Sequence, residues 1–307
     1  MQATDPTTPA SSTATLASIE QAVFESVAYS DIFDYPVTAA EIHRSLTVEA
    51  SIEEVESALS SHHLVPALLT SQGPYYCLTG REHVFETRGR RLEHSTRLMR
   101  IGRAYGTLIA QLPFVRMVAV TGSLAVDNAE ADDDIDYLIV TAPGRVWTAR
   151  AFTMLAVRLA ARRGITLCPN YILSDDVLAL DQHDLYTARE LVQMQPIASH
   201  ETYKRLLAAN PWRTDLLPNA SITVEALPVA PRPWHKRAIE ATLRTSIGER
   251  LERWIFERKS AELRREAGAN DEAVFDRTVC KGHFDRHRTR TTTSLADRIR
   301  TVDEASQ

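Results

Sequence analysis

The sequence has few cysteines, few glycines and no long apolar run, and each shortage excludes a class of protein. Its 307 residues include only 3 cysteines, spaced far apart, which argues against a disulfide framework and favours a reducing, cytoplasmic setting. With 11 glycines and 14 prolines, the chain is neither collagen-like nor of low complexity. No apolar stretch approaches the ~20 residues that a membrane-spanning helix needs, so we expect a soluble protein without a membrane partner.

What the sequence contains is an ordinary globular composition with an uneven distribution of charge. Its length corresponds to about two domains at ~150 residues each. Residues 1–16 have neither the basic cluster nor the apolar segment of a secretory signal, and we expect a disordered leader there. Residues 1–80 contain one basic residue, Arg44, against ten acidic ones, whereas residues 81–307 have a small excess of basic residues. This contrast indicates two modules with different electrostatics.

Residues 17–80 are predicted to form three helices and a hairpin. Apolar residues at helical spacing begin at Ile19, and capping boxes at 38–41 and 51–54 predict the starts of the second and third helices. Two strand-like runs follow, separated by a turn signal at 71–73. This order of elements resembles the winged-helix fold.

A winged helix that binds DNA inserts its third helix into the major groove, where cationic side chains must meet the phosphates. The third helix predicted here instead carries Glu53, Glu54 and Glu56 and has no lysine or arginine. We therefore expect no binding of duplex DNA. We interpret the segment as a packing module or as a docking site for a protein partner.

Residues 81–111 are predicted to form a connecting helix that carries seven arginines. These arginines are expected to form a solvated face or to dock against the acidic first module, in preference to binding phosphate. The apolar positions expected to face inward are Val84, Leu92, Leu98, Ile101, Tyr105 and Leu108.

The region 112–228 alternates strands and helices, which predicts an α/β core of the α+β kind with a mixed sheet. The segments VRMVAV, IDYLIV and ITLCPNYIL are predicted strands, and helices are expected at 146–163 and in the segments DLYTARELVQM and ETYKRLLAAN. After a proline-rich linker, residues 234–290 are predicted to be a helical C-terminal region with one long helix at 235–267. Residues 291–307 are expected to be a frayed tail.

Two segments of this core carry the residues that point to a chemical function. One predicted strand ends in Gly122-Ser123, and ten residues later Asp134-x-Asp136 leads into the next strand. Alternation along a strand places Asp134 and Asp136 on the same side about 7 Å apart, where they repel each other unless a cation lies between them. Hard oxygen ligands of this kind suit Mg²⁺. Gly122 allows a close approach of the backbone to phosphate, and Ser123 can add a donor.

This arrangement, an apolar strand, Gly-Ser, and Asp-x-Asp in an apolar strand, resembles the DNA polymerase β-like nucleotidyltransferase superfamily. The resemblance extends to bacterial uncharacterised nucleotidyltransferase-domain proteins with segments similar to YSDIFDYP, APGRVWTAR, CPNYIL and LYTARELVQMQP. It implies two Mg²⁺ or Mn²⁺ ions on a nucleoside triphosphate, and attack of an acceptor hydroxyl on the α-phosphate. It assigns phosphate binding to Gly122 and Ser123, and metal binding to Asp134 and Asp136.

Active members of this superfamily usually have a third carboxylate on a later strand. On the corresponding strand here the central polar residue is Asn170, whose amide oxygen can bind Mg²⁺ but cannot act as a base. Three alternatives remain open at this point. Asn170 replaces the carboxylate, or Asp175 or Asp176 at the end of the strand supplies it, or Glu190 on the next helix does.

Basic residues beyond the Asp-x-Asp strand can hold a triphosphate or an anionic acceptor. The candidates for nucleotide binding are Arg189 and Lys204. Further basic residues of this kind are Arg145, Arg150 and Arg205.

The segment Cys280-x-x-His283, with His287 nearby, is a candidate metal site. Zinc normally takes four ligands in paired spacings, and the sequence has no second cysteine pair. A basic cluster that contacts phosphate or an acidic partner, and a solvated tail, are the competing interpretations.

The preferred hypothesis is an Mg²⁺-dependent nucleotidyltransferase that moves an NMP group from an NTP to a hydroxyl of a small-molecule acceptor. The alternative is a catalytically degenerate protein that retains the nucleotide-binding fold and engages a protein partner. The presence of a third carboxylate near Asp134 and Asp136 would favour the enzyme over the binding protein.

Overall fold

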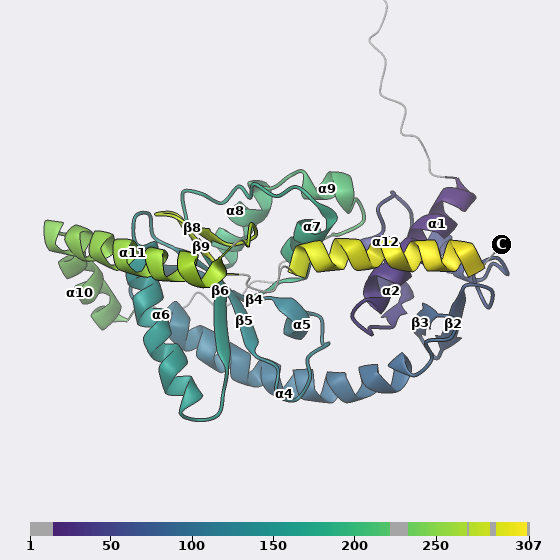
Figure 1. Ribbon diagram of the computed structural model, residues 1–307, viewed down its shortest axis with the longest axis horizontal. Coiled ribbons are helices and arrows are strands. Elements are labelled where there is room, and N and C mark those ends of the chain that lie inside the picture. The colour runs from purple at the N-terminus through teal and green to yellow at the C-terminus, as the bar shows by residue number, and fades with distance from the viewer. Residues whose placement is uncertain (1–14, 222–232, 269, 283–286, 306–307) are drawn as a thin grey trace, which may run out of the picture.

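The computed structural model describes residues 15–221, 233–268, 270–282 and 287–305 (Figure 1). Within these residues the chain is a mixed α/β protein with a six-stranded mixed sheet, and a smaller unit of three helices and three strands precedes the sheet. Most of the expected leader lies outside the described residues. No helix in the described ranges is long and apolar enough to cross a membrane.

The smaller unit, which we call the N-terminal module (16–78), contains the predicted three helices and hairpin in order, together with a short strand, β1, that was not predicted. Both predicted capping boxes are present, with Thr38 and Ser51 as the capping residues. The strands form an antiparallel sheet in the order β1-β3-β2. The elements are α1 (Leu16–Asp31), β1 (Val37–Thr38), α2 (Ala39–Ser45), α3 (Ile52–Leu59), β2 (Leu69–Gln72) and β3 (Tyr75–Leu78).

The connecting helix is α4 (Val84–Ala110), and its inward face differs in part from the prediction. Leu92 and Leu108 are 41% and 55% exposed, whereas Gly102 is buried. A Cβ atom at Gly102 would lie 3.3 Å from Ile135 Cγ2, so the small residue lets the helix lie close against the sheet. Tyr137 strengthens this contact because its hydroxyl donates a 2.7 Å hydrogen bond to the Gly102 carbonyl.

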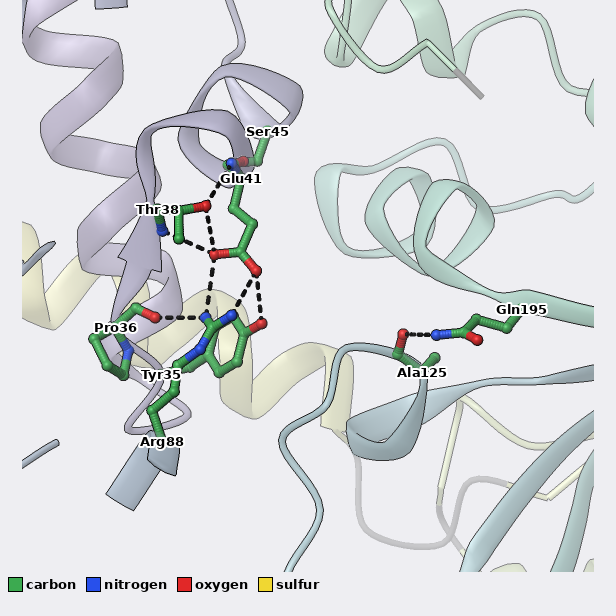
Figure 2. A network of polar contacts seen from close by, with 8 residues as sticks. All are labelled: Tyr35, Pro36, Thr38, Glu41, Ser45, Arg88, Ala125 and Gln195. Carbon is green, nitrogen blue, oxygen red and sulfur yellow. Dashed lines mark hydrogen bonds and ion pairs between the residues drawn. The ribbon is translucent and has the colours of Figure 1, made fainter. Parts of the chain in front are cut away.

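Arginines just before α4 and in its second turn bind the acidic N-terminal module, as expected from the charge distribution. Arg81 forms ion pairs with Asp31 and Asp34. Arg88 Nη2 lies 2.8 Å from Glu41 Oε1, and its Nη1 donates to the Pro36 carbonyl at 2.6 Å. Figure 2 shows the contacts of Arg88 with Glu41 and Pro36 on one side and the hydrogen bond from Gln195 Nε2 to the Ala125 carbonyl on the other.

The central sheet has the strand order β7-β4-β5-β6-β9-β8. Only β5 and β6 are parallel neighbours; the other pairs are antiparallel. The strands are β4 (Val115–Val120), β5 (Ile135–Thr141), β6 (Leu167–Ser174), β7 (Gln195–Ala198), β8 (Val274–Phe275) and β9 (Val279–Lys281). The sequence predicted β4, β5 and β6 and missed the three short strands, of which β7 tolerates Pro196 because it lies at the sheet edge.

Helices cover both faces of this sheet. One face packs in a core with α4, α6 (Val146–Ala161) and α11 (Ser246–Ala267), and the other with α7 (Leu185–Gln193) and α8 (His200–Ala208). Side chains of β5 alternate between the two cores. The remaining short helices are α5 (Gly122–Ala125) and α9 (Arg213–Leu216).

The C-terminal region is helical, as predicted, but the single long helix expected there is divided into two helices. The chain turns between α10 (Trp234–Leu243) and α11. A Cβ atom at Gly248 would overlap the carbonyl of Leu243, so this glycine permits the close approach at the turn.

The expectation of a frayed tail is wrong. Residues of that segment belong to α12 (His287–Ala305), which crosses to the N-terminal module (Figure 1). Leu295 and Ile299 pack on the apolar core of the module, and Arg298 Nε lies 2.8 Å from Asp31 Oδ2. Burial against another part of the chain thus stabilises a helix that has weak local signals.

Candidate functional site

Antiparallel pairing of β4 and β5 brings the two motifs together. The chain leaves β4 at Val120, which is paired with Tyr137, and the Thr121 amide donates to the Asp136 carbonyl at 3.1 Å. The turn into α5 therefore lies beside the start of β5. Asp134 immediately precedes β5, so both carboxylates of the motif stand next to the Gly122-Ser123 turn.

Gly122 is required at this position for two independent reasons. Its φ is +68°, in the left-handed region that favours glycine. A Cβ atom there would lie only 2.5 Å from Asp136 Oδ2. The backbone of the turn and the Asp136 carboxylate therefore share a space that admits no side chain at 122.

The Ser123 hydroxyl has a partner within the same turn. Its Oγ donates to Asp133 Oδ2 at 3.2 Å, and Asp133 Oδ2 also accepts a hydrogen bond from the Glu130 amide at 2.9 Å. Asp133 is thus a structural residue of the loop. This contact distinguishes it from Asp134 and Asp136, in agreement with the predicted register.

Asp134, Asp136 and Cys168 form a compact cluster. One ligand atom from each lies within 4.8 Å of the others. Cys168 joins because parallel pairing of β5 and β6 sets it opposite Asp136. Burial, followed by the charges of Asp134 and Glu190, raises the pKa of Asp136 to about 8. A cation bound here would offset the repulsion between these acidic groups that contributes to the raised pKa.

The two carboxylates fit one divalent cation. Mg²⁺ binds oxygen at about 2.0–2.1 Å, so two oxygens on one ion lie within roughly 4.2 Å of each other, and small side-chain adjustments achieve this. The third member of the cluster does not suit Mg²⁺, because burial and then the charges of Asp136 and Asp134 raise the pKa of the Cys168 thiol. The cluster therefore offers two oxygen-donor side chains and a neutral thiol.

Asn170 faces the cluster, and its side-chain amide is hydrogen-bonded to one of the two carboxylates. Its Nδ2 donates to Asp136 Oδ1 at 2.8 Å. Asn170 and Cys168 are two residues apart on β6 and both line the cavity described below, as strand alternation requires. This alternation was the signal that could have identified Cys168 from the sequence.

Asp175 and Asp176 lie at the opposite end of β6. The Asp175 amide donates to the Thr141 carbonyl at 2.8 Å, at the far end of β5. Asp175 is seven residue steps along the chain from Cys168, roughly 23 Å at ~3.3 Å per residue of strand. Asp175 also accepts two hydrogen bonds from Arg205, at 2.9 and 3.0 Å. The structure therefore does not bring either acid to Asp134 and Asp136.

Helix α7 contributes two charged residues, Arg189 and Glu190, to the same cavity. Asp184 caps this helix by accepting the Thr187 amide at 2.8 Å. Burial raises the pKa of Glu190 to about 7, while the charge of Lys281 acts in the opposite direction. Arg189 lines the cavity as well, whereas Lys204 is exposed on α8 and is not among the lining residues.

The cavity has a volume of about 1180 Å³ and lies between the N-terminal module and the sheet. Its core-side wall contains Gly122, Ser123, Asp134, Asp136, Asn170 and Glu190. The opposite wall comes from the N-terminal module and contains Tyr29, Phe33, Tyr35, Glu41, Arg44 and Ser45. Sequence reasoning missed this second wall because its residues are brought to the site only by packing of the module.

The zinc interpretation falls largely outside the described residues. Cys280 is buried on β9 in the core of the sheet. His283 is not among the described residues, and the side chain of His287 is not described either.

Comparison of the chain with known protein families, with curated proteins and with solved structures finds no match.

Proposed function

We propose that this chain is an Mg²⁺-dependent nucleotidyltransferase of the DNA polymerase β-like kind. It would transfer an NMP group from an NTP to a hydroxyl of a small-molecule acceptor. The observation that carries this proposal is the convergence of the Gly122 turn, Asp134 and Asp136 at one corner of a large cavity. Uncompensated carboxylates beside a side-chain-free turn are what a metal-bound triphosphate requires.

In this reaction the acceptor oxygen forms a bond to the α-phosphorus, and the bond between that phosphorus and the bridging oxygen to the β-phosphate breaks. Pyrophosphate is the leaving group. Asp134 and Asp136 would hold Mg²⁺, which supplies charge stabilisation for the triphosphate. The turn at Gly122 and Ser123 would bind phosphate oxygens. The Ser123 hydroxyl would then donate its hydrogen bond to a phosphate oxygen in place of Asp133.

Glu190 is the residue that we assign as the general base. It lines the cavity together with Asp136, and its charge influences the pKa of Asp136. A carboxylate with a pKa near 7 is well suited to accept the proton of the acceptor hydroxyl at neutral pH. Asn170 then acts as a positioning residue that holds Asp136 through its amide.

We further propose that the N-terminal module is a winged helix adapted to close this cavity. Its order of elements and its three-stranded sheet support that assignment. Glu53 and Glu56 are exposed on α3, the helix that would enter the major groove of DNA. This charge opposes the binding of duplex DNA, and the module instead supplies one wall of the proposed site.

The test is an assay of pyrophosphate release with each radiolabelled NTP, Mg²⁺ and a panel of hydroxyl-bearing metabolites. We expect release with at least one pair of substrates, and no release from the Asp134→Asn/Asp136→Asn variant. Mg²⁺–NTP should also raise the melting temperature of the wild-type protein and not of this variant. An equal shift in the folded double variant would refute the assignment of the metal site.

One observation favours a second candidate function, a binding protein that has lost catalysis. The third position of the metal cluster is a neutral thiol and not a carboxylate. Such a protein would be stabilised by Mg²⁺–NTP without releasing pyrophosphate, and its N-terminal module would engage a protein partner. Stabilisation without turnover across all four NTPs and the acceptor panel would favour this alternative.

A further inference from the structure

Arg189 is buried at the junction of the core and the N-terminal module. Its side chain projects from α7, the residue is only 3% exposed, and it lines the large cavity. The guanidinium carbon lies 3.6 Å from the centre of the Tyr29 ring, a stacking contact across the junction. Nη2 donates one hydrogen bond, at 3.3 Å, to the Ser45 carbonyl at the end of α2. The N-terminal module thus fixes the orientation of this arginine.

This cation has little electrostatic compensation within the described part of the chain. A guanidinium has five N–H donors, yet Arg189 Nε has no hydrogen-bond partner. No ion pair joins Arg189 to a described carboxylate, whereas Arg81, Arg88 and Arg205 each have at least one. Burial accordingly lowers the pKa of Arg189 to about 10. A buried, underbonded charge of this kind is costly unless a ligand completes it.

We propose that Arg189 is the anion-binding residue of the acceptor subsite, and that the acceptor carries a phosphate or carboxylate group in addition to its reacting hydroxyl. This inference rests on the proposed nucleotidyl transfer. The planar fork of an arginine matches either oxyanion with two parallel hydrogen bonds. A lysine, being a point charge, would not reproduce this geometry.

The location of Arg189 favours the acceptor over the triphosphate. The phosphate-binding turn at Gly122 belongs to the sheet, whereas Arg189 is held by Tyr29 and Ser45 of the N-terminal module. The cavity of about 1180 Å³ exceeds the ≈ 300–1,000 Å³ typical of a single-ligand pocket, which leaves room for a second molecule beside a nucleotide.

The walls near Arg189 suit a ring-bearing molecule. Tyr29 also contacts Phe33, with ring centroids 5.7 Å apart, and both line the cavity. Aromatic faces provide apolar contact to the body of a ligand, while Arg189 holds its charged end. The acceptor is therefore expected to be a compact, ring-containing anion with a free hydroxyl.

Binding of small anions without metal tests this inference separately from the nucleotide site. We would titrate the full-length protein in EDTA with phenyl phosphate, benzoate and, as the uncharged control, phenol, and measure dissociation constants by calorimetry. Without metal, Asp134 and Asp136 supply no positive charge, so saturable binding of an anion must come from a cationic side chain. We expect saturable binding of phenyl phosphate or benzoate, and none of phenol. The stronger of the two anions identifies the charged group of the acceptor.

Arg189→Gln and Arg189→Lys are the test variants, and Arg205→Gln is the matched control. Arg205 is an exposed arginine whose ion pair with Asp175 lies at the far end of β6. We expect both changes at 189 to weaken the binding of the anion by about tenfold or more, and Arg205→Gln to leave it unchanged. Circular dichroism would confirm folding, and if Arg189→Gln does not fold, Arg189→Lys decides the outcome.

Two results would overturn the inference: anion binding of wild-type strength in the folded 189 variants, or no anion binding to the wild-type protein. The Asp134→Asn/Asp136→Asn variant should still bind the anion in EDTA. Its loss of Mg²⁺–NTP binding concerns the proposed function alone. Failure of the acceptor subsite and failure of the nucleotide site are therefore distinguishable.

Discussion

Aspartates stand at both ends of the parallel pair β5 and β6, and their surroundings differ in a way that separates function from structure. At one end Asp136 and Asp134 crowd together beside a cavity, with no described cation between them. At the other end Asp175 is neutralised by two hydrogen bonds from Arg205. The residue type, aspartate, is the same at both ends. The presence or absence of a compensating charge is what distinguishes the candidate ligand site from the structural ion pair.

Opposite ends of the sheet also differ in the freedom of the backbone. Gly122, beside the carboxylate pair, and Gly144, in the loop after β5, both have positive φ. Only at Gly122 would an added methyl group meet another atom, the Asp136 carboxylate. The comparison teaches that the corner at Gly122 is shaped for close approach, whereas the glycine at the other end serves only a turn.

The largest expected effect concerns catalysis at the crowded end. Glu190→Gln should lower the rate of pyrophosphate release by ~10²–10⁴-fold, because the variant loses the proposed base and keeps the metal pair. In the wild type the rate should rise as the pH passes about 7, since the base must be deprotonated and burial raises the pKa of Glu190 to that value. Glu201→Gln, an exposed change on α8, is the control.

If Glu190→Gln and Glu201→Gln have equal rates, the base lies elsewhere. Stopped-flow detection of pyrophosphate and a thermal shift with Mg²⁺–NTP would be measured on the same samples. Retained nucleotide binding with lost turnover is the pattern that a base predicts.

Gly122→Ala and Gly144→Ala test the difference in backbone space. Each should destabilise the protein by ~1–3 kcal/mol because a residue with a Cβ is strained at positive φ. Gly122→Ala should cost more than Gly144→Ala, since its methyl group collides with Asp136, and it alone should abolish binding of Mg²⁺–NTP. Urea denaturation and calorimetry would measure the two effects. Equal destabilisation with intact nucleotide binding would contradict the close approach at Gly122.

Cys168→Asp would make the crowded end more acidic, with Cys168→Ser as the control. Without metal, a third carboxylate beside Asp136 should lower the melting temperature through like-charge repulsion. With Mg²⁺ the sign should reverse, and affinity for the ion should improve by roughly tenfold, or about 1.4 kcal/mol. Titration of Mg²⁺ followed by melting temperature tests both signs. A variant whose stability does not respond to Mg²⁺ would exclude an ion at this cluster.

The smallest effect belongs to the compensated end. Asp175→Asn should destabilise the protein by only about 0.2–1 kcal/mol, because the Arg205 side chain of its ion pair is about half exposed to solvent. Turnover and Mg²⁺–NTP binding should remain those of the wild type. A large loss of activity in this variant would mean that the two ends of the sheet are coupled, and the comparison would fail.

Local signals in the sequence determined much of the fold. The capping boxes at Thr38 and Ser51 predicted two helices because their hydrogen bonds join residues only three apart. Apolar runs predicted β4, β5 and β6, since buried strands are recognised by composition. The sequence also singled out Gly122, Asp134 and Asp136, because a turn between apolar strands and strand alternation are local properties.

Only the tertiary structure decided how distant segments complete the site. Strand alternation places Cys168 on the same face as Asn170, but only the parallel pairing of β5 and β6 set Cys168 opposite Asp136 and Asp175 beside the far end of β5. Packing of α12 on the N-terminal module stabilised a segment that was predicted to be frayed. The same module brought Tyr29 onto Arg189. These outcomes depend on contacts between residues far apart in the chain, whose energies arise from burial and complementary charge and so appear only when the chain is folded.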